Sequence, residues 1–186
     1  MRRIIAFEFL SLDGFMAGPR GEEMDFVTSS FNQEMEKDLA VQYEEIDAFV
    51  MGKTTFQSLA AYWPTASSKD ELLRGYMNSY EKLVFSTTMD DVSAWSNSRL
   101  LGPDAESQIK QIKERPGKDI MIIGSASLVQ AFSKRQLIDE FRFFLFPVVL
   151  GAGKPLFAHQ EKAIHLDTLH TKHFDTGVVR VDYARA

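Results

Sequence analysis

The sequence predicts an α/β fold of three layers (α/β/α), in which helices cover both faces of a mainly parallel central sheet. Two observations support it. Apolar, strand-like runs alternate with helix-like segments as far as residue 150, and this alternation implies right-handed crossovers between parallel strands. The last two strand-like segments have no helix between them, so we expect antiparallel strands at the edge of the sheet.

The first half of the chain begins with an Ile- and Phe-rich strand at 3–12, followed by a loop at 13–23 that contains three glycines and a proline. Residues 32–46 have the spacing of an amphipathic helix, because apolar residues recur there at steps of four, four and three. A short apolar strand follows at 47–52, and then a short helix at 54–63.

The second half continues with predicted strands at 81–87, 119–124 and 140–150, and with predicted helices at 104–115 and 127–136. Asp104 is the expected N-cap of the first of these helices. The final strands are expected near 164–170 and 174–184, with a turn at residues 175–177.

Length and composition indicate a single domain, residues 1–186, with an ordinary globular balance of 45% hydrophobic and 25% charged residues. The net charge of -5 argues against a general nucleic-acid binder, which needs a basic face. Without cysteine there is no disulfide and no thiolate catalysis. We find no membrane-spanning run and no signal peptide, since Glu8 interrupts the first apolar segment, so a cytoplasmic protein is expected.

The stretch FVMGKTTFQSL, residues 49–59, contains the Gly-Lys-Thr that ends a nucleoside-triphosphate loop. That loop requires a glycine five positions before Gly52, where this chain has Asp47. A strand that runs directly into a helix can still bind an anion, because helix N-terminal amides attract negative charge and Lys53 adds a cation. The alternative is a plain strand-to-helix turn with Thr54 as N-cap.

A second turn of this kind occurs in IMIIGSASLVQAF, residues 120–132, where small residues follow a buried strand and precede a helix. A phosphate fits on such amides, although a tight turn selected for packing remains the alternative. Two turns that can each bind a phosphate favour a ligand with more than one phosphate, such as a dinucleotide. In VFSTT, residues 84–88, three hydroxyls stand at a strand end, which favours the 2'-phosphate of NADPH over NADH.

These segments resemble the dihydrofolate reductase superfamily, and most closely the branch with the reductase domain of bacterial riboflavin biosynthesis (the RibD C-terminal domain). The matching segments are SLDGFMAG, VMGKTTFQS, VFSTT, IMIIGSASLVQAF and IDEFRFFLFPVVLGAGKPLF, in the family's order. The resemblance implies a dihydrofolate reductase-like fold and an NADPH-dependent oxidoreductase. The family reaction closest to it is that of 5-amino-6-(5-phosphoribosylamino)uracil reductase.

The resemblance also implies a set of cofactor-binding residues. The adenosine-side phosphates are expected at Gly52, Lys53, Thr54 and Thr55, and the adenosine ribose at Ser86, Thr87 and Thr88. The pyrophosphate turn corresponds to Gly124, Ser125, Ala126, Ser127 and Leu128, and the loop over the nicotinamide to Met16 and Ala17. Three departures stand out: Gly124-Ser125 stands where folate reductases have a Gly-Gly pair, Ser127 replaces an arginine of some folate reductases, and Ile123 replaces an acid that riboflavin reductases tend to carry.

Asp13, in SLDG at the end of the first strand, is the expected catalytic carboxylate that helps a proton arrive. The alternative is an Asp-Gly turn residue that bonds backbone. Asp25 is a further candidate, and so are the acids at 34, 36 and 38 on the first long helix, unless these form a solvated face. Phe26, Phe31 and Trp63 are candidates to stack on a flat heterocycle, or pack in the core.

The remaining predictions concern metals and partners. The four histidines, at 159, 165, 170 and 173, fit no metal-binding helix spacing, so no metal is expected. The partner is a small heterocyclic molecule, and a homodimer is expected as in the riboflavin-type reductases. The two subunits would pair along the strand FRFFLFPVV, unless this segment is a central strand of the monomer's own sheet. The alternative functions are a dihydrofolate- or pteridine-type reductase, and a non-catalytic nucleotide-binding module of the same fold.

Overall fold

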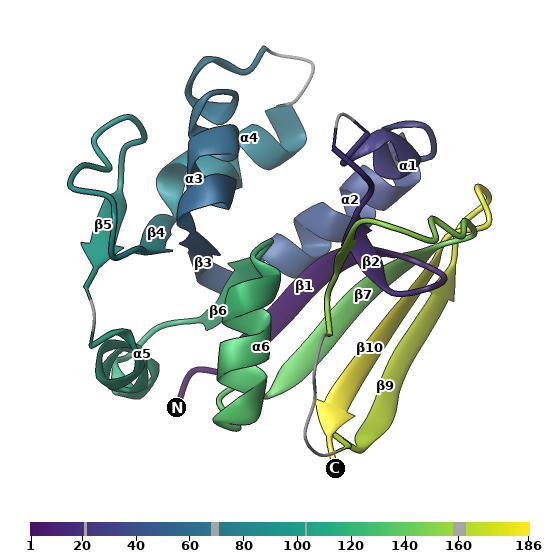
Figure 1. Cartoon of the computed structure of the whole chain (residues 1–186). Coiled ribbons are helices and arrows are strands. Elements are labelled where there is room, and N and C mark those ends of the chain that lie inside the picture. The colour runs from purple at the N-terminus through teal and green to yellow at the C-terminus, as the bar shows by residue number, and fades with distance from the viewer. Residues whose placement is uncertain (21, 68–70, 103, 158–162) are drawn as a thin grey trace. The chain divides into compact units, whose positions relative to one another are not determined.

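The computed structural model describes residues 1–20, 22–67, 71–102, 104–157 and 163–186 (Figure 1). Its strands are β1 (Ile4–Ser11), β2 (Phe15–Ala17), β3 (Ile46–Gly52), β4 (Glu81–Phe85), β5 (Ser98–Leu101), β6 (Asp119–Ile123), β7 (Glu140–Phe146), β8 (Lys154–Pro155), β9 (Leu166–His173) and β10 (Val179–Arg185). Its helices are α1 (Asp25–Thr28), α2 (Gln33–Tyr43), α3 (Lys53–Ala60), α4 (Glu71–Ser79), α5 (Ala105–Glu114) and α6 (Ala126–Lys134), with a 3-10 turn η1 (Trp63–Thr65).

The main sheet has eight strands in the order β5-β4-β3-β6-β1-β7-β10-β9. β4 pairs in parallel with β3 and β5, β3 with β6, and β1 with β7, whereas β10 is antiparallel to both β7 and β9. The predicted fold class, a mainly parallel sheet with antiparallel C-terminal edge strands, is therefore confirmed. The chain divides into two compact units, which are described separately, and the prediction of one domain over 1–186 stays a prediction.

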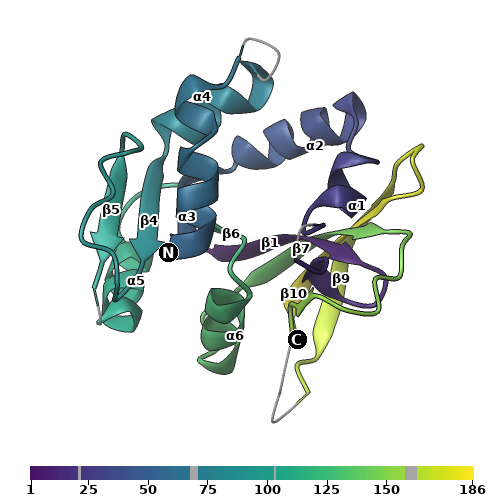
Figure 2. The ribbon, with the colours of Figure 1, turned by 45° about the horizontal axis from the view of Figure 1, so that its top comes forward.

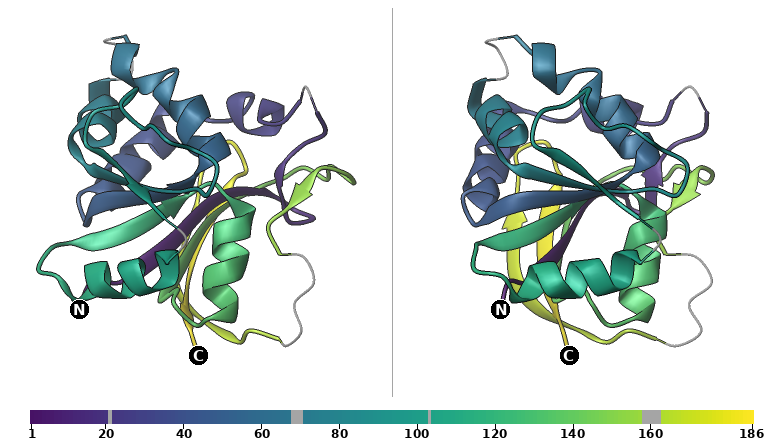
Figure 3. Two further views of the ribbon diagram at one scale, coloured as in Figure 1. Left: turned by 60° about the vertical axis from the view of Figure 1, so that its left-hand side comes forward. Right: turned by 90° about the vertical axis from the view of Figure 1, so that its left-hand side faces the viewer.

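The first unit comprises Met1–Ile4 and Glu36–Ser125. Its sheet core is β3, in which Ala48 to Met51 are fully buried because parallel strands are covered on both faces. In Figure 3, α5 lies on one side of β3, β4 and β6, and α3 with α4 lies on the other. Consequently β3 and β6 end in glycine turns that lead into helices α3 and α6, at the edge where α/β sheets bind ligands.

The second unit comprises Ile5–Met35 and Ala126–Ala186. Figure 2 shows α6 running alongside the strands of this unit. β7 lies between β1 and β10, so both of its hydrogen-bonding edges are occupied. The prediction that this strand offers an edge for a dimer is therefore wrong, and the alternative of a central strand is confirmed. A homodimer stays a prediction without an assigned surface.

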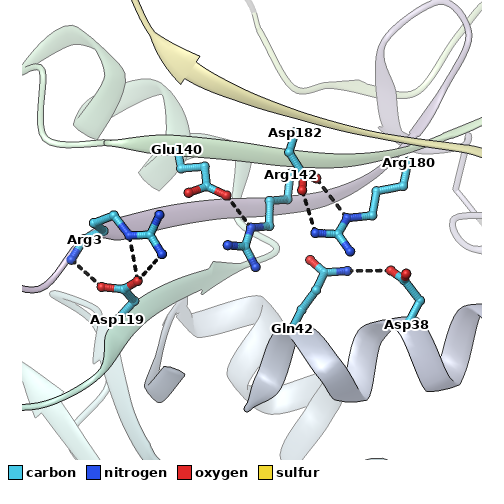
Figure 4. A network of polar contacts seen from close by, with 8 residues as sticks. All are labelled: Arg3, Asp38, Gln42, Asp119, Glu140, Arg142, Arg180 and Asp182. Atoms are coloured by element: carbon cyan, nitrogen blue, oxygen red, sulfur yellow. Dashed lines mark hydrogen bonds and ion pairs between the residues drawn. The ribbon is translucent and has the colours of Figure 1, made fainter. Parts of the chain in front are cut away.

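Ion pairs occupy buried positions on the β7 and β10 strands of the second unit (Figure 4). Arg142 donates to Glu140 at 2.6 Å, and Arg180 donates to Asp182 at 2.9 Å and 2.5 Å. In the first unit, Gln42 donates to Asp38, and Arg3 is paired with Asp119 (Figure 4). Because a buried charge is costly without a partner, the Arg142–Glu140 and Arg180–Asp182 contacts reduce the cost of burying these four charges.

Several predicted boundaries shift for local reasons. β7 ends at Phe146 and not at 150, because Pro147 has no amide hydrogen to continue the ladder. Asp104 is the N-cap of α5 as predicted, but its side chain makes no capping hydrogen bond. The sequence prediction also missed β5 and α4, although Leu73 and Met77 of α4 are buried at helical spacing. Over the described ranges, no helix is long and apolar enough to cross a membrane.

Candidate active site

The turn between β3 and α3 places Gly52 at the N-cap of the helix, one residue ahead of Lys53. Thr54 is therefore inside the first helical turn and is not the N-cap considered as the plain alternative. The first amides of a helix have no acceptor within the helix, and the helix dipole makes this end attractive to an anion. The local geometry therefore suits a phosphate, as expected for Gly52 to Thr55.

The turn after β6 has a different backbone geometry, with Gly124 at φ 58° and Ser125 at φ 74°. A left-handed conformation is easily adopted by glycine but disfavoured for serine, so Ser125 is held there by its surroundings. Backbone strain of this kind gathers at ligand-binding turns.

Within the first unit, these two turns lie against one another. A Cβ placed on Gly52 would approach Ser125 Oγ to 2.7 Å, and a Cβ on Gly124 would approach Thr55 Oγ1 to 2.8 Å. Neither glycine therefore has room for a side chain. The two predicted phosphate-binding turns thus pack against each other through backbone and hydroxyl groups, and we call this pair of turns the glycine cradle (Gly52, Thr55, Gly124 and Ser125).

A hydroxyl-rich strand end adjoins the cradle through Lys53, whose Nζ donates to Thr88 Oγ1 at 3.2 Å. Ser86 Oγ accepts hydrogen bonds from the backbone amides of Thr88 and Met89, both at 3.1 Å. These two bonds order the segment after β4. Thr87 and Thr88 are exposed. Within the first unit, the structure therefore brings together the predicted segments 52–55, 86–88 and 124–125, with the Lys53 cation among several hydroxyls.

The other predicted pyrophosphate residues, Ala126, Ser127 and Leu128, form the first turn of α6 in the second unit. Ala126 is buried and Ser127 is exposed. The helix N-terminus expected after the glycine turn is therefore present.

In the second unit, Asp13 clamps two loops together. Its carboxylate accepts hydrogen bonds from Ser11 Oγ at 2.6 Å, from the Leu150 amide at 3.1 Å and from the Gly151 amide at 2.7 Å. These bonds, that of Ser11 foremost, lower the pKa of Asp13 to about 2. A carboxylate that is ionised at neutral pH is a poor proton donor, so the geometry favours the loop role, and the catalytic role stays a prediction.

We expect Asp13→Asn to lower the thermal stability at neutral pH. One carboxylate oxygen would become an NH2 group, which cannot accept a hydrogen bond from the Leu150 or Gly151 amide. A depressed carboxyl pKa stabilises the fold above the unfolded pKa, near 3.8, and this stabilisation is lost as the pH falls towards about 2. The difference in urea midpoint between the variant and the wild type should therefore narrow below pH 3.8. Asp90→Asn, at an exposed position, is the control. Unchanged stability with abolished turnover would instead support the catalytic role.

The predicted nicotinamide loop contains Met16 and Ala17, which are half-buried in β2. β2 pairs with β8, with Ala17 opposite Lys154. A Cβ on Gly153, which has φ 132°, would overlap the carbonyl oxygen of Ala17. Only glycine therefore allows β8 to approach this loop so closely.

Glu8 is an acid that interrupts the apolar run of the first strand and is not among the predicted site residues. It lies in the middle of β1, is 4% exposed, and its Oε1 has no hydrogen-bond partner among the described residues. Burial raises the pKa of Glu8 well above its ordinary value, and Lys154 opposes this shift. The signal in the sequence was a single charge within IIAFEFL.

An aromatic cluster covers the opposite face of β1. The Phe9 ring meets four others edge to face: Phe7, Phe31, Phe144 and Phe146, at 5.1–5.8 Å. Phe26 is buried against Phe146, so core packing accounts for it, whereas Phe9 and Phe31 remain half-buried. In the first unit, Trp63 is half-buried, and its Nε1 has no hydrogen-bond partner among the described residues.

The other predicted acids and the described histidines are not gathered into one cluster. Glu34 Oε1 lies 3.6 Å from Lys172 Nζ, and Asp38 accepts a hydrogen bond from Gln42 Nε2. His170 and His173 lie on the exposed edge strand β9, and His159 lies outside the described residues. No cluster of three or more potential metal-binding side chains occurs in the part of the chain that the structure describes.

Comparison with known proteins gives a family match over almost the whole chain: the model of the RibD C-terminal domain matches residues 2–180. Two uncharacterized proteins of Bacillus subtilis (strain 168) are similar. YyaP is 33% identical, and the match covers 98% of this chain and 94% of YyaP. YwjB is 27% identical, and the match covers 100% of this chain and 99% of YwjB.

Solved structures support the same fold. A Shewanella sp. PV-4 protein named for riboflavin biosynthesis has a TM-score of 0.82 at 24% identity, with 99% of each chain covered. A bifunctional deaminase and 5-amino-6-(5-phosphoribosylamino)uracil reductase of Thermotoga maritima has a TM-score of 0.70 at 14% identity, and the match covers this chain fully and 57% of that one. Dihydrofolate reductase of Enterococcus faecalis, complexed with NADP(H), has a TM-score of 0.64 at 11% identity, and the match covers 98% of this chain and 96% of that one.

Proposed function

We propose that this chain, which belongs to the RibD C-terminal domain family, is an NADPH-dependent reductase of a small heterocyclic substrate. A reaction like that of 5-amino-6-(5-phosphoribosylamino)uracil reductase is the first candidate, since a protein of that name shares the fold. A pteridine-type reductase is the second candidate, because dihydrofolate reductase shares the fold as well. A non-catalytic nucleotide-binding module is the third.

The observation that carries the proposal is the glycine cradle. Gly52 and Gly124 let the two turns approach so closely that the Ser125 and Thr55 hydroxyls lie directly against their backbones. Lys53 and Thr88 adjoin it with a cation and a further hydroxyl. These groups fit the phosphates of a dinucleotide, and Lys53 suits the additional charge of a 2'-phosphate.

NADPH supplies the hydride when it is bound. In this proposal the glycine cradle and Lys53 would hold the phosphates, and Met16 and Ala17 would have the nicotinamide role that the resemblance implies. The half-buried rings of Phe9 and Phe31 suit a flat, uncharged heterocycle. A neutral aromatic surface of this kind favours a pyrimidine or pteridine ring over an aliphatic substrate.

Titration with NADPH tests the proposal. We expect quenching of the chain's tryptophan fluorescence and a higher melting temperature, because a ligand that binds only the folded state stabilises it. Loss of nicotinamide absorbance is then followed with pterins, folates and phosphoribosylated aminopyrimidines. Turnover of one class identifies the reductase, and binding without turnover on any class supports the nucleotide-binding module. The absence of NADPH binding would refute the proposal.

The Lys53→Ala variant should lose NADPH affinity about tenfold or more while it retains its NADH affinity, because a charge-assisted hydrogen bond contributes about 1.5–3 kcal/mol. Lys53 is half-buried at the start of α3, so the fold should persist. The measurement is the ratio of the two dissociation constants, with the exposed Lys110→Ala as the control for net charge. An equal loss for both nucleotides would contradict a role in reading the 2'-phosphate.

A further inference from the structure

β9 is a long, exposed edge of the main sheet (Figure 1). It stands last in the strand order, and among the described residues β10 is the only strand that pairs with it. Apart from Leu166 and Lys172, all of its residues are exposed. Proteins usually keep such an edge short or cover it, so an exposed edge of eight residues is a ready template for another strand.

A bulge divides β9 near its middle. Asp182 of β10 lies opposite His170, and the next residue of β10, Tyr183, lies opposite Thr168. Leu169 is therefore an extra residue without a counterpart, as in a β-bulge. Side chains of a regular strand alternate between the two faces of the sheet, and the bulge shifts this alternation by one residue.

Because of the bulge, Asp167 and Lys172 lie on the same face. Lys172 is opposite Arg180 and Asp167 is opposite Ala184. These two β10 residues are four positions apart and therefore share a face, so their partners on β9 do as well. One face of the edge thus has a negative charge near its start and a positive charge near its end.

Hydrogen bonds beside the two ends of β9 show which of its backbone groups point outward. The Phe174 amide donates to the Val178 carbonyl, and the His165 carbonyl accepts from the Ala186 amide. Positions 174 and 165 therefore point toward β10. In an antiparallel pair, inward and outward positions alternate from each of these ends as far as the bulge. The outward positions are Leu166, Thr168, Thr171 and His173.

The outward positions are symmetric about the midpoint of β9, between residues 169 and 170. We consider a second copy of β9 laid antiparallel about a two-fold axis through this midpoint. Leu166 then lies opposite His173 of the second copy, and Thr168 lies opposite Thr171. Every outward position meets another outward position, and each such pair exchanges two hydrogen bonds. A displacement by one residue would set outward groups against inward groups, so the register is specific.

The same alignment also pairs the charges. Asp167 lies opposite Lys172 of the second copy, and the two-fold axis repeats the pair. Opposite charges directly across an antiparallel pair stabilise it. Lys172 Nζ lies 3.6 Å from Glu34 Oε1, and its ammonium group has three N–H donors, so it can keep this contact and also bond Asp167.

We propose that two copies of this chain join their sheets by antiparallel pairing of β9, in the register that sets Asp167 opposite Lys172. A copy of β9 satisfies the backbone pattern and the charge pattern at once, which favours it over an unrelated strand. The inference does not rest on the proposed function, because its residues all lie in the second unit and none is assigned to NADPH. It supplies the surface that the homodimer prediction lacked.

Disulfide trapping tests the register, because the chain has no cysteine of its own. Asp167→Cys and Lys172→Cys are prepared separately, mixed and oxidised. Opposite Cα atoms of an antiparallel pair lie about 4.5–5.5 Å apart, within the reach of a disulfide, so the mixture should give a covalent dimer. Neither variant alone should do so, because equal positions lie about 17 Å apart, five residues at ~3.3 Å. Asp167→Cys mixed with the exposed Lys110→Cys is the control for random collision.

Sedimentation velocity measures the affinity of the dimer. We expect the wild type to dimerise and to dissociate on dilution. Thr171→Pro should weaken the dimer at least tenfold, because it removes one outward N–H donor from each strand. It should leave the fold intact, since this amide makes no bond to β10. Thr171→Val keeps the amide, so it is the matched control and should dimerise as the wild type does. Circular dichroism reports that each variant is folded.

Each outcome decides the proposal. A wild type that is monomeric at every concentration, or a dimer whose affinity Thr171→Pro leaves unchanged, would overturn it. Cross-linking of either cysteine variant alone, or none in the mixture, would overturn the register and the proposal with it. If Thr171→Pro does not fold, the wild-type sedimentation and the cysteine mixture still decide. NADPH titration of the wild type tests the proposed function separately, and its failure would leave the β9 interface intact.

Discussion

Gly124→Ala should lose at least tenfold in NADPH affinity and about 1–2 kcal/mol of folding stability. The new Cβ would lie 2.8 Å from Thr55 Oγ1 and 3.0 Å from Thr55 Cγ2, so the two turns of the cradle must separate. The backbone contributes a second cost, because φ 58° disfavours any residue with a Cβ by about 1 kcal/mol. The affinity is measured by NADPH titration and the stability by urea unfolding.

Two further variants separate the causes of the Gly124→Ala effect. Thr55→Ala removes the two nearest atoms, so the double variant should recover the steric part of the loss and retain the backbone part. Gly75→Ala, in α4, is the matched control: nothing lies within 4 Å of its added Cβ, so it should be neutral or stabilising by up to about 1 kcal/mol. Wild-type NADPH affinity in Gly124→Ala would contradict a cradle that binds phosphate.

Lys82→Met should destabilise the fold by about 3 kcal/mol. Lys82 is fully buried in β4, where Nζ donates to the carbonyl oxygens of Met77 and Asn78, both at 3.1 Å, and lies 4.7 Å from the centre of the Trp95 ring. Methionine keeps the apolar stem but leaves the C-terminal carbonyls of α4 without this donor. Urea unfolding measures the loss, and Lys110→Met, in an exposed ion pair with Glu106, should change stability by less than about 0.5 kcal/mol.

The pH dependence of the unfolding free energy, compared between the wild type and Lys82→Met, gives a second check. Desolvation lowers the pKa of Lys82 from 10.5 to about 8. Between these values the unfolded chain binds more protons than the folded chain, so the stability contributed by Lys82 rises with pH across this window. The advantage of the wild type over Lys82→Met should therefore increase from pH 8 towards 10.5. A constant difference would show that Lys82 keeps its ordinary pKa in the fold.

The sequence predicted the parts of the fold that periodicity and chain order encode. β1, β3, β6 and α6 were found because a long apolar run or a helical spacing marks each of them. The short β5 and β8 were missed because two to four residues carry no period, and their pairing depends on distant partners. The end of β7 was misjudged because its apolar composition continues past Pro147, where hydrogen bonding stops.

The candidate site was predictable where glycine and hydroxyl patterns mark a turn. The approach of Gly52 to Ser125 could not be read from the sequence, because these residues are 73 positions apart (125 − 52) and meet only through the pairing of β3 with β6. The loop contacts of Asp13 were equally hidden, since its acceptor atoms meet amides of residues 150 and 151. Glu8 was visible as an isolated charge, but its burial and missing partner were not.

The Asp13 clamp has a consequence for how the chain folds. The hydrogen bonds of Asp13 span 137 and 138 residues, and β1 pairs with β7 over a similar separation. On the ribosome, the N-terminal strand therefore emerges long before its neighbour exists. Contacts of such long range close slowly, because a long loop must be ordered first. The loops that Asp13 joins should accordingly be among the last parts of the protein to mature, after the residues at 36–125 have been synthesised.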